Sequence, residues 1–280
     1  MKSPSGSLPF FLLTGVSEHN RPHHALGGCQ ASKLHGPLLV KPLIFLFATA
    51  IAVMSAFGSL PTYPVYQFPP GTRKTSALPV AGDWKPISAG LLRHSMGNSL
   101  RPLPRVAFRI AYDADALYLF YKVKEYAVRA VARQHGDIVC GDSCVEFFFS
   151  PSGDLSAGYF NLEMNCGGTT LLHYHFSDGS RIHKTTAREF RGATVSTSLP
   201  HLVDPERKGP LVWTLTARIP FKVLQRVHPF STPVSGTVWR ANFFKCGDKT
   251  SRPHWLAWAK VNRTEPAFHV PEAFGRMVFQ

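Results

Sequence analysis

The sequence of 280 residues contains few acidic side chains and no cluster of basic ones. Asp and Glu number 17 against 31 Lys and Arg, which gives a formal net charge of +14 with neutral histidines. No run of Lys and Arg is longer than a pair such as Arg73 and Lys74, and no signature of a nucleic-acid-binding fold accompanies the charge. We therefore expect a basic, solvated surface and no nucleic-acid partner.

The sequence also lacks the short motifs of several enzyme classes. It contains neither a glycine-rich phosphate loop nor the His-Glu pattern of zinc proteases. Ser143 is flanked by Asp142 and Cys144, whereas a nucleophile elbow places glycines near the serine. These absences disfavour phosphate-loop, zinc-protease and nucleophile-elbow chemistry.

Cysteine is scarce, with five residues in the chain. Cys29 lies in the N-terminal segment, and the other four, Cys140, Cys144, Cys166 and Cys246, can pair in three ways. The spacing of Cys140 and Cys144 is wider than that of a two-residue zinc knuckle, and the last two stand alone at large separations. The sequence therefore disfavours a zinc site and leaves both disulfides and buried thiols open.

The N-terminal segment 1–58 has the features of an export leader. Residues 43–57 carry no charge, follow lysines and end in small residues, which is the tripartite pattern of a secretory signal. This apolar stretch is shorter than the roughly 20 residues that span a bilayer. We predict cleavage before Ser59 and a secreted or periplasmic protein; a single N-terminal membrane anchor is the alternative. A translation start near residue 40 would explain the unusually long segment in front.

The rest of the chain divides into an entry segment and one domain. Residues 59–82 are rich in proline and predict a linker or an extended entry segment before a compact domain at 83–280. In that domain, short runs of aromatic and β-branched residues alternate with turn residues about every ten positions. No alternation of helices and strands is present, which disfavours a parallel α/β sheet.

These runs predict a two-sheet antiparallel β-sandwich of jelly-roll-like form, an all-β fold. One short helical turn is expected after Pro220. A hairpin is expected around the aspartate-containing turn 112–116. The expected strands are 106–111, 117–123, 128–132, 145–150, 159–165, 169–176, 194–199, 212–219, 237–245, 255–260 and 276–279.

One expected strand carries a polar face suited to sugar hydroxyls. In residues 159–165, apolar side chains alternate with Asn161, Glu163 and Asn165, which therefore share one face. Amides and a carboxylate spaced about 7 Å apart can hydrogen-bond the hydroxyls of a sugar. An ordinary solvated strand face is the alternative interpretation.

Two tryptophans near the C-terminus offer a stacking surface. Trp255 and Trp258 are three residues apart, so in an extended strand they point to opposite faces. One of them is expected to be exposed or to line a groove, where an indole can cover the apolar face of a pyranose ring. A position at the edge of the core is the alternative. Trp213 and Trp239 alternate with apolar neighbours and are expected in the core.

Glu146 and Glu163 raise the question of catalysis. Two carboxylates facing one cleft from neighbouring strands could hydrolyse a glycosidic bond. Retaining and inverting enzymes place the pair about 5 Å or about 6.5 to 9.5 Å apart. The sequence does not give this distance, so a catalytic pair remains an alternative to binding.

Metal-ligating residue types occur in weak patterns only. His173 and His175 share one face of an expected strand but have no visible third ligand. Asp113, Asp115 and Asp142 lie in expected turns, where calcium ligands could gather, but their spacing matches no calcium-loop consensus. No cofactor follows from these residues.

Four stretches of the sequence, in this order and spacing, carry a resemblance to a known family. They are 113–123, 142–148 with the sequence Asp-Ser-Cys-Val-Glu-Phe-Phe, 159–169 beginning Tyr-Phe-Asn-Leu-Glu-Met-Asn, and 274–279 beginning Phe-Gly. The chain from 83 to 280 resembles carbohydrate-binding module family 9 and its relatives in these stretches.

The resemblance implies a non-catalytic β-sandwich that binds sugars, of the kind attached to xylanases and related hydrolases, with calcium in structural roles. It also implies that Trp258, or else Trp255, is one of two rings that sandwich a sugar. Asn161 and Asn165 would be partners for its hydroxyls. The second ring has no counterpart, because 137–140 contains no aromatic residue.

These observations predict a secreted, monomeric protein that binds plant or microbial polysaccharide, such as xylan or cellulose, in carbohydrate catabolism. The alternative is an O-glycosyl hydrolase that uses Glu146 and Glu163. A third class is an adhesion or polyanion-binding module driven by the basic charge. Its affinity would fall steeply with salt, whereas ring stacking would not.

Overall fold

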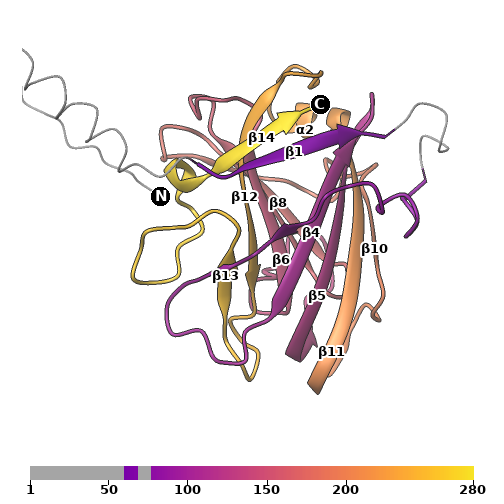
Figure 1. Ribbon diagram of the computed structural model, residues 1–280, viewed down its shortest axis with the longest axis vertical. Coiled ribbons are helices and arrows are strands. Elements are labelled where there is room, and N and C mark those ends of the chain that lie inside the picture. Colours follow the sequence, from indigo (N-terminus) through magenta and orange to yellow (C-terminus); the bar gives the residue numbers. More distant parts are fainter. Residues whose placement is uncertain (1–59, 69–76) are drawn as a thin grey trace, which may run out of the picture. The chain divides into compact units, whose positions relative to one another are not determined.

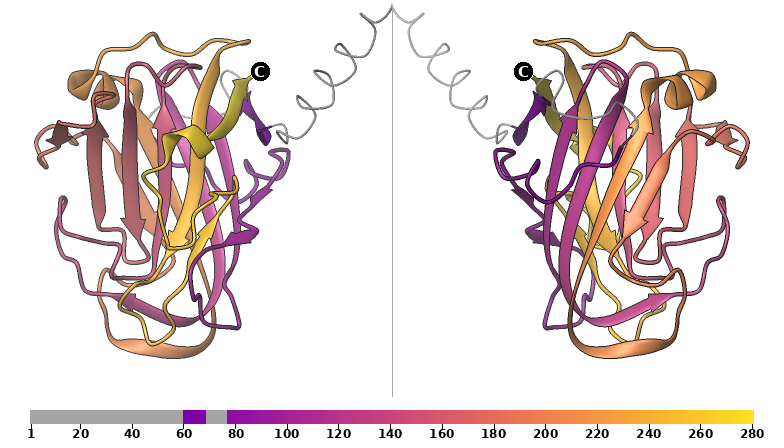
Figure 2. Two further views of the ribbon diagram at one scale, coloured as in Figure 1. Left: turned by 90° about the vertical axis from the view of Figure 1, so that its left-hand side faces the viewer. Right: turned by 90° about the vertical axis from the view of Figure 1, so that its right-hand side faces the viewer.

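Two β-sheets packed face to face make up the part of the chain that the structure describes, residues 60–68 and 77–280 (Figure 1). The structure is a computed structural model. Figure 2 shows the strands in two facing layers, which confirms the predicted β-sandwich; hydrogen bonding through β1 makes the two layers continuous. In the described ranges, no helix is long and apolar enough to cross a membrane. The predicted leader 1–58, with its signal-like stretch and Cys29, lies outside the described residues.

The first sheet is antiparallel around its long central strands. In spatial order its strands are β10 (Thr194–Thr197), β11 (Val203–Pro220), β5 (Ala116–Ala130) and β4 (Arg105–Tyr112), with β2 (Gly90–Leu91) beside β4. β4 and β5 form the predicted hairpin. The separate strand expected at 128–132 is wrong, because β5 continues without a turn and pairs with β11 as far as Ala130.

The second sheet is also antiparallel. In spatial order its strands are β14 (Gly275–Phe279), β12 (Val238–Cys246), β6 (Cys144–Ser150), β7 (Tyr159–Asn165), β8 (Thr170–His175) and β9 (Ile182–Lys184). β13 (Trp255–Ala257) pairs with the end of β12, and β3 (His94–Ser95) pairs with β13. The expected strand 159–165 is confirmed residue for residue as β7.

Strand β1 (Thr62–Gln67) joins the two sheets. It runs parallel first to β14 and then, over its last two residues, to β4. Val65 is fully buried between the sheets. The segment 59–82 therefore contains a core strand, and the compact unit starts well before the expected residue 83. Pro64 concealed this strand in the sequence, because proline cannot donate to a β-ladder.

The one expected helical turn is also present. It forms α2 (Phe221–Val227), directly after Pro220, and buries three apolar side chains at the end of the sandwich. A short 3-10 turn, η1 (Pro271–Ala273), precedes β14.

The interior between the sheets is filled mainly by aromatic rings. Phe108 of β4 stacks on Phe243 of β12 with ring centroids 3.6 Å apart, so the two layers are in direct contact. Trp213 and Trp239 are almost completely buried, as their alternation with apolar neighbours predicted. Each buried large ring contributes roughly 2 to 3 kcal/mol, so the aromatic interior between the sheets is the main source of stability.

The outer face of the second sheet is covered as well. β13 and the chain from 258 to 274 fold back over β6, β7 and β12, where Phe148 and Phe244 pack against Phe274. Every residue of β6 and β7 is therefore buried, on both faces of the sheet. Polar side chains on this outer face lie in a shielded environment.

One ion pair lies inside the sandwich, among the described residues, with both side chains fully buried. The Lys245 ammonium of β12 lies 2.9 Å from Oε2 of Glu125 on β5, so the pair connects the two sheets. Trp213 donates its indole N–H to Glu125 Oε1 at 2.6 Å. His254 is held neutral, because burial and Lys245 lower its pKa to about 3, and its Nε2 accepts from the ammonium at 2.8 Å.

We predict that Lys245→Met lowers the free energy of unfolding by about 3 to 5 kcal/mol, because it leaves the Glu125 carboxylate buried without its cation. Urea denaturation measures this change. Lys122→Met, at an exposed position on β5, is the matched control and should change stability by less than about 0.5 kcal/mol. Equal stability of the two variants would contradict the structural role of the ion pair.

Candidate functional site

A cavity of about 200 Å³ opens on the outer face of the second sheet. Its floor is formed by side chains from β6, β7 and β12, and its walls come from β13, the loops after β12 and β13, and the loop before β6. The lining residues that carry chemistry are Glu146, Glu163, Cys140, Cys246, Asp248, Trp255, Phe268 and His269. Carboxyl and thiol groups on the floor and aromatic rings on the wall thus line the same cavity.

The two glutamates of the floor lie directly opposite one another. Glu146 of β6 pairs in register with Glu163 of β7, and the two are 2% and 9% exposed. Side chains in such a pair have Cβ atoms about 5 Å apart. Asn161, two residues along the same face, donates its amide to Glu163 Oε1 at 2.9 Å. The predicted polar face of β7 therefore holds part of the floor in place.

Burial and crowding of negative charge perturb these carboxyl groups. Burial and the neighbouring Asp248 raise the pKa of Glu163 to about 7. Burial and Glu163 raise the pKa of Glu146 well above its usual range. Partial burial also raises the pKa of Asp248 at the cavity mouth. At neutral pH the cavity thus holds carboxyl groups that both donate and accept hydrogen bonds.

The wall of the cavity presents flat apolar surface. Trp255 of β13 is half-buried, and its indole N–H donates to Asp248 Oδ1 at 2.8 Å, which fixes the ring. Phe268 stacks on Phe244 with centroids 4.2 Å apart. His269 Nδ1 lies 2.9 Å from the hydroxyl of Tyr159. The ring of Trp255 is thus positioned beside the carboxylates of the floor.

Two of the predicted site residues lie elsewhere. Trp258 packs into the edge of the core, with its ring 5.8 Å from that of Phe243 and roughly perpendicular to it. Asn165 has no exposed surface and donates to Asp142 Oδ2 at 2.9 Å while it accepts from two backbone N–H groups of the following turn. The structure therefore brings together Trp255, Glu163 and Asn161, but not Trp258 or Asn165.

The expected opposition of the two tryptophans is confirmed, since one lines the cavity and the other touches the core. The sequence placed Trp258 before Trp255 as a stacking residue; in the structure Trp255 lines the cavity and Trp258 packs against the core, because of how the chain folds over β12. Sequence reasoning missed Asp248, Phe268 and His269, which lie in loops without a motif.

Two of the aspartates considered for calcium have partners within the protein. Both Asp113 oxygens are occupied: one accepts from backbone N–H groups of its own turn, the other from the hydroxyl of Tyr118. Asp142 Oδ2 accepts from the backbone of Val131 and Ala132. In the described residues, the one group of three ligand atoms within 4.8 Å of one another consists of Cys144, Glu146 and Cys246 instead. His173 and His175 belong to no such group.

Comparison with known proteins agrees with this architecture. The family model described as carbohydrate-binding family 9 matches residues 96–279. A protein from Bacteroides uniformis ATCC 8492, whose name assigns it provisionally to carbohydrate binding, is 32% identical; the match has a TM-score of 0.68 and covers 79% of this chain and 100% of that chain. None of the curated proteins matches the chain.

More distant structures share the fold. A family 9 module from Caldicellulosiruptor kristjanssonii in complex with cellotriose is 14% identical, with a TM-score of 0.52 and coverage of 79% of this chain and 94% of that chain. Its complex with glucose gives 14% identity, a TM-score of 0.50 and coverage of 79% and 96%.

The raised pKa values make stability depend on pH. Glu163 binds its proton more tightly in the folded state, with a pKa of about 7, than in the unfolded chain, where it is near 4.5. This contribution to stability is fully present below about pH 4.5 and is lost as the pH rises through 7. With a chelator present, we expect the free energy of unfolding to fall by on the order of 2 kcal/mol between pH 5 and 8.

Urea denaturation at several pH values measures this slope. Glu163→Gln should flatten it, whereas Glu272→Gln, which alters an exposed carboxylate, should leave it unchanged. A slope that Glu163→Gln does not reduce would contradict the assignment.

Proposed function

Because the chain belongs to carbohydrate-binding family 9, we propose that the cavity between Trp255 and the glutamates binds one sugar ring of a gluco- or xylo-oligosaccharide. The observation that carries this proposal is the position of the Trp255 indole beside Glu163 and Asp248. The apolar face of a pyranose can lie on the indole while its hydroxyls reach the carboxyl groups.

The size of the cavity supports recognition of a single ring. Its volume of about 200 Å³ is smaller than the roughly 300 to 1,000 Å³ of sites for drug-sized ligands. A longer chain would therefore place one ring in the cavity and extend along the surface. The related module from Caldicellulosiruptor kristjanssonii, solved with cellotriose and with glucose, makes gluco-configured sugars the first ligands to test.

The affinity should be modest. One stacked ring and a few hydrogen bonds supply about 4 to 8 kcal/mol, which corresponds to dissociation constants from millimolar to micromolar. Partly protonated carboxyl groups suit this task, because a sugar hydroxyl can donate to one oxygen and accept from another. A binding protein of this kind needs no proton transfer from the site.

Export of the protein fits the same proposal. The signal-like pattern at 43–57 favours a protein that meets polysaccharide outside the cytoplasm, as a monomer, in the breakdown of plant or microbial glycans. N-terminal sequencing of the protein recovered outside the cytoplasm tests the leader: a start at or near Ser59 is expected, and retention of residues 1–37 would contradict a cleaved leader.

We expect Trp255→Ala to weaken binding of cellotriose at least about tenfold, because it removes the stacking surface. Isothermal titration calorimetry measures this loss. Trp258→Phe is the matched control: it changes a tryptophan outside the cavity, keeps an aromatic ring against Phe243, and should leave the affinity within about twofold. The reverse pattern, loss only in Trp258→Phe, would contradict the assignment.

A hydrolase is the second candidate, favoured by one observation: Glu146 and Glu163 oppose each other in the cavity with raised pKa values. Directly opposite strand positions are compatible with the separation of about 5 Å in retaining enzymes. Yet Glu146 is only 2% exposed and its Oε1 accepts from the thiol of Cys246 at 3.0 Å, which suits a structural or ligand-holding group better than a nucleophile.

We therefore expect no new reducing ends when the protein is incubated with xylan or cellulose. A reducing-sugar assay at pH 5 and pH 7 measures this directly. Turnover that disappears in both Glu146→Gln and Glu163→Gln would replace the binding proposal with the hydrolase.

A further inference from the structure

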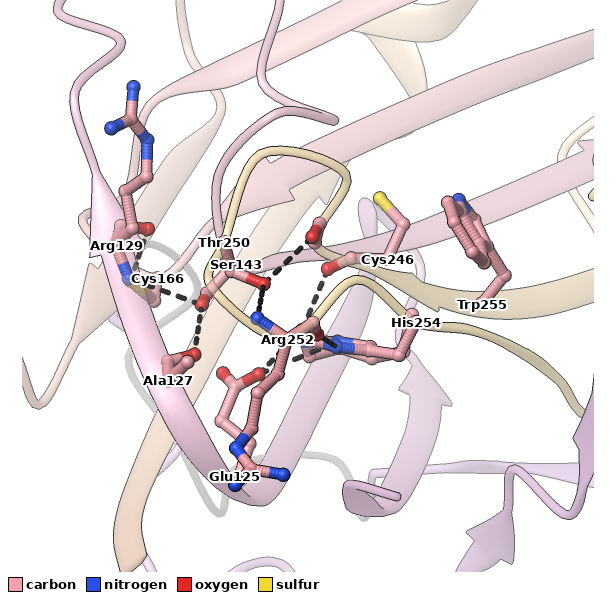
Figure 3. A network of polar contacts seen from close by, with 12 residues as sticks. Glu125, Ala127, Arg129, Ser143, Cys166, Cys246, Thr250, Arg252, His254 and Trp255 are labelled. Carbon is pink, nitrogen blue, oxygen red and sulfur yellow. Dashed lines mark hydrogen bonds and ion pairs between the residues drawn. The ribbon is translucent and has the colours of Figure 1, made fainter. Parts of the chain in front are cut away.

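Cys144 and Cys246, far apart in the sequence, lie directly opposite each other on β6 and β12; Cys246 lines the cavity, and Cys144 is fully buried beside it. Both are present as free thiols. The Cys246 thiol also donates to Glu146 Oε1 at 3.0 Å. Figure 3 shows the Cys246 side chain directed away from Glu125 and His254, on the side where Trp255 lies.

The three ligand atoms are close enough to hold one ion. All lie within 4.8 Å of one another. In a tetrahedral zinc site with Zn–S bonds of about 2.3 Å, two sulfur ligands are about 3.8 Å apart. The rigid ladder of β6 and β12 holds the two sulfurs without help from a loop.

The surroundings of these atoms favour a cation. Glu146, Glu163 and Asp248 gather around them, whereas the nearest buried cation, Lys245, has its ammonium on the inner face of the sheet and paired with Glu125. The donor set of two sulfurs and a carboxylate suits zinc, since calcium prefers oxygen ligands. Three protein ligands leave a fourth position that faces the cavity.

We propose that Cys144, Cys246 and Glu146 bind one thiophilic divalent cation of the zinc class, with its fourth coordination position open to the cavity. The two thiols and the carboxyl group of Glu146 lose their protons to solvent when the metal binds, and the two sulfur atoms and a carboxylate oxygen become its ligands. The inference does not rest on sugar binding, since its test measures the metal alone.

A disulfide is the competing state of this pair. In the structure both cysteines are free thiols, the form that a metal requires.

The test uses the full chain without an affinity tag, reduced and stripped of metal. Competition with a chromophoric chelator measures Zn²⁺ binding, and Co²⁺ substitution reports thiolate ligation through charge-transfer absorption. We expect about one equivalent of Zn²⁺ per chain and a loss of at least about 100-fold in affinity in Cys144→Ser and in Cys246→Ser.

Cys166→Ser is the matched control, because Cys166 is equally buried but donates to the carbonyl of Arg129 away from the cluster. It should retain the affinity of the unchanged chain, and thermal unfolding should show that all three variants fold. Absence of stoichiometric Zn²⁺, or binding that Cys144→Ser and Cys246→Ser leave unchanged, would overturn the proposal. A Cys144–Cys246 disulfide found by peptide mapping of protein isolated without reductant would also overturn it.

Discussion

The ion pair between Lys245 and Glu125 fixes the strand on which the site depends. Because it connects β12 to β5 through the interior, it sets which residues of β12 face inward. Successive strand residues alternate between faces, so an inward Lys245 requires that Cys246 face outward into the cavity. The neutral His254 and the indole of Trp213 supply the hydrogen bonds that make a fully buried pair tolerable.

On the outer face of the same sheet, the covering chain shields polar side chains from water, and these side chains form the candidate site. Covering β6, β7 and β12 from outside removes water from Glu146 and Glu163, and this is the main reason why their pKa values rise. The covering chain also carries Trp255 to the edge of these carboxyl groups. Aromatic surface, carboxyl groups and thiols therefore share one small cavity in a fold that belongs to carbohydrate-binding family 9.

Sequence patterns within one strand predicted the features that depend only on neighbouring residues. The alternation in 159–165 defined β7, and the spacing of the two tryptophans correctly required opposite faces. Pairing over long distances escaped prediction: Cys144 and Cys246 meet only because β6 lies beside β12. Strand β1 was missed because Pro64 and the prolines around the strand suggested a linker, and its stability comes from neighbours about 45 and 210 residues away, in β4 and β14.

A crystal structure of the protein with cellotriose would show directly whether this cavity binds sugar. We expect a sugar ring on the indole of Trp255, with hydroxyls at hydrogen-bond distance from Glu163 and Asp248. A ring bound away from this cavity, for example against the first sheet, would contradict it.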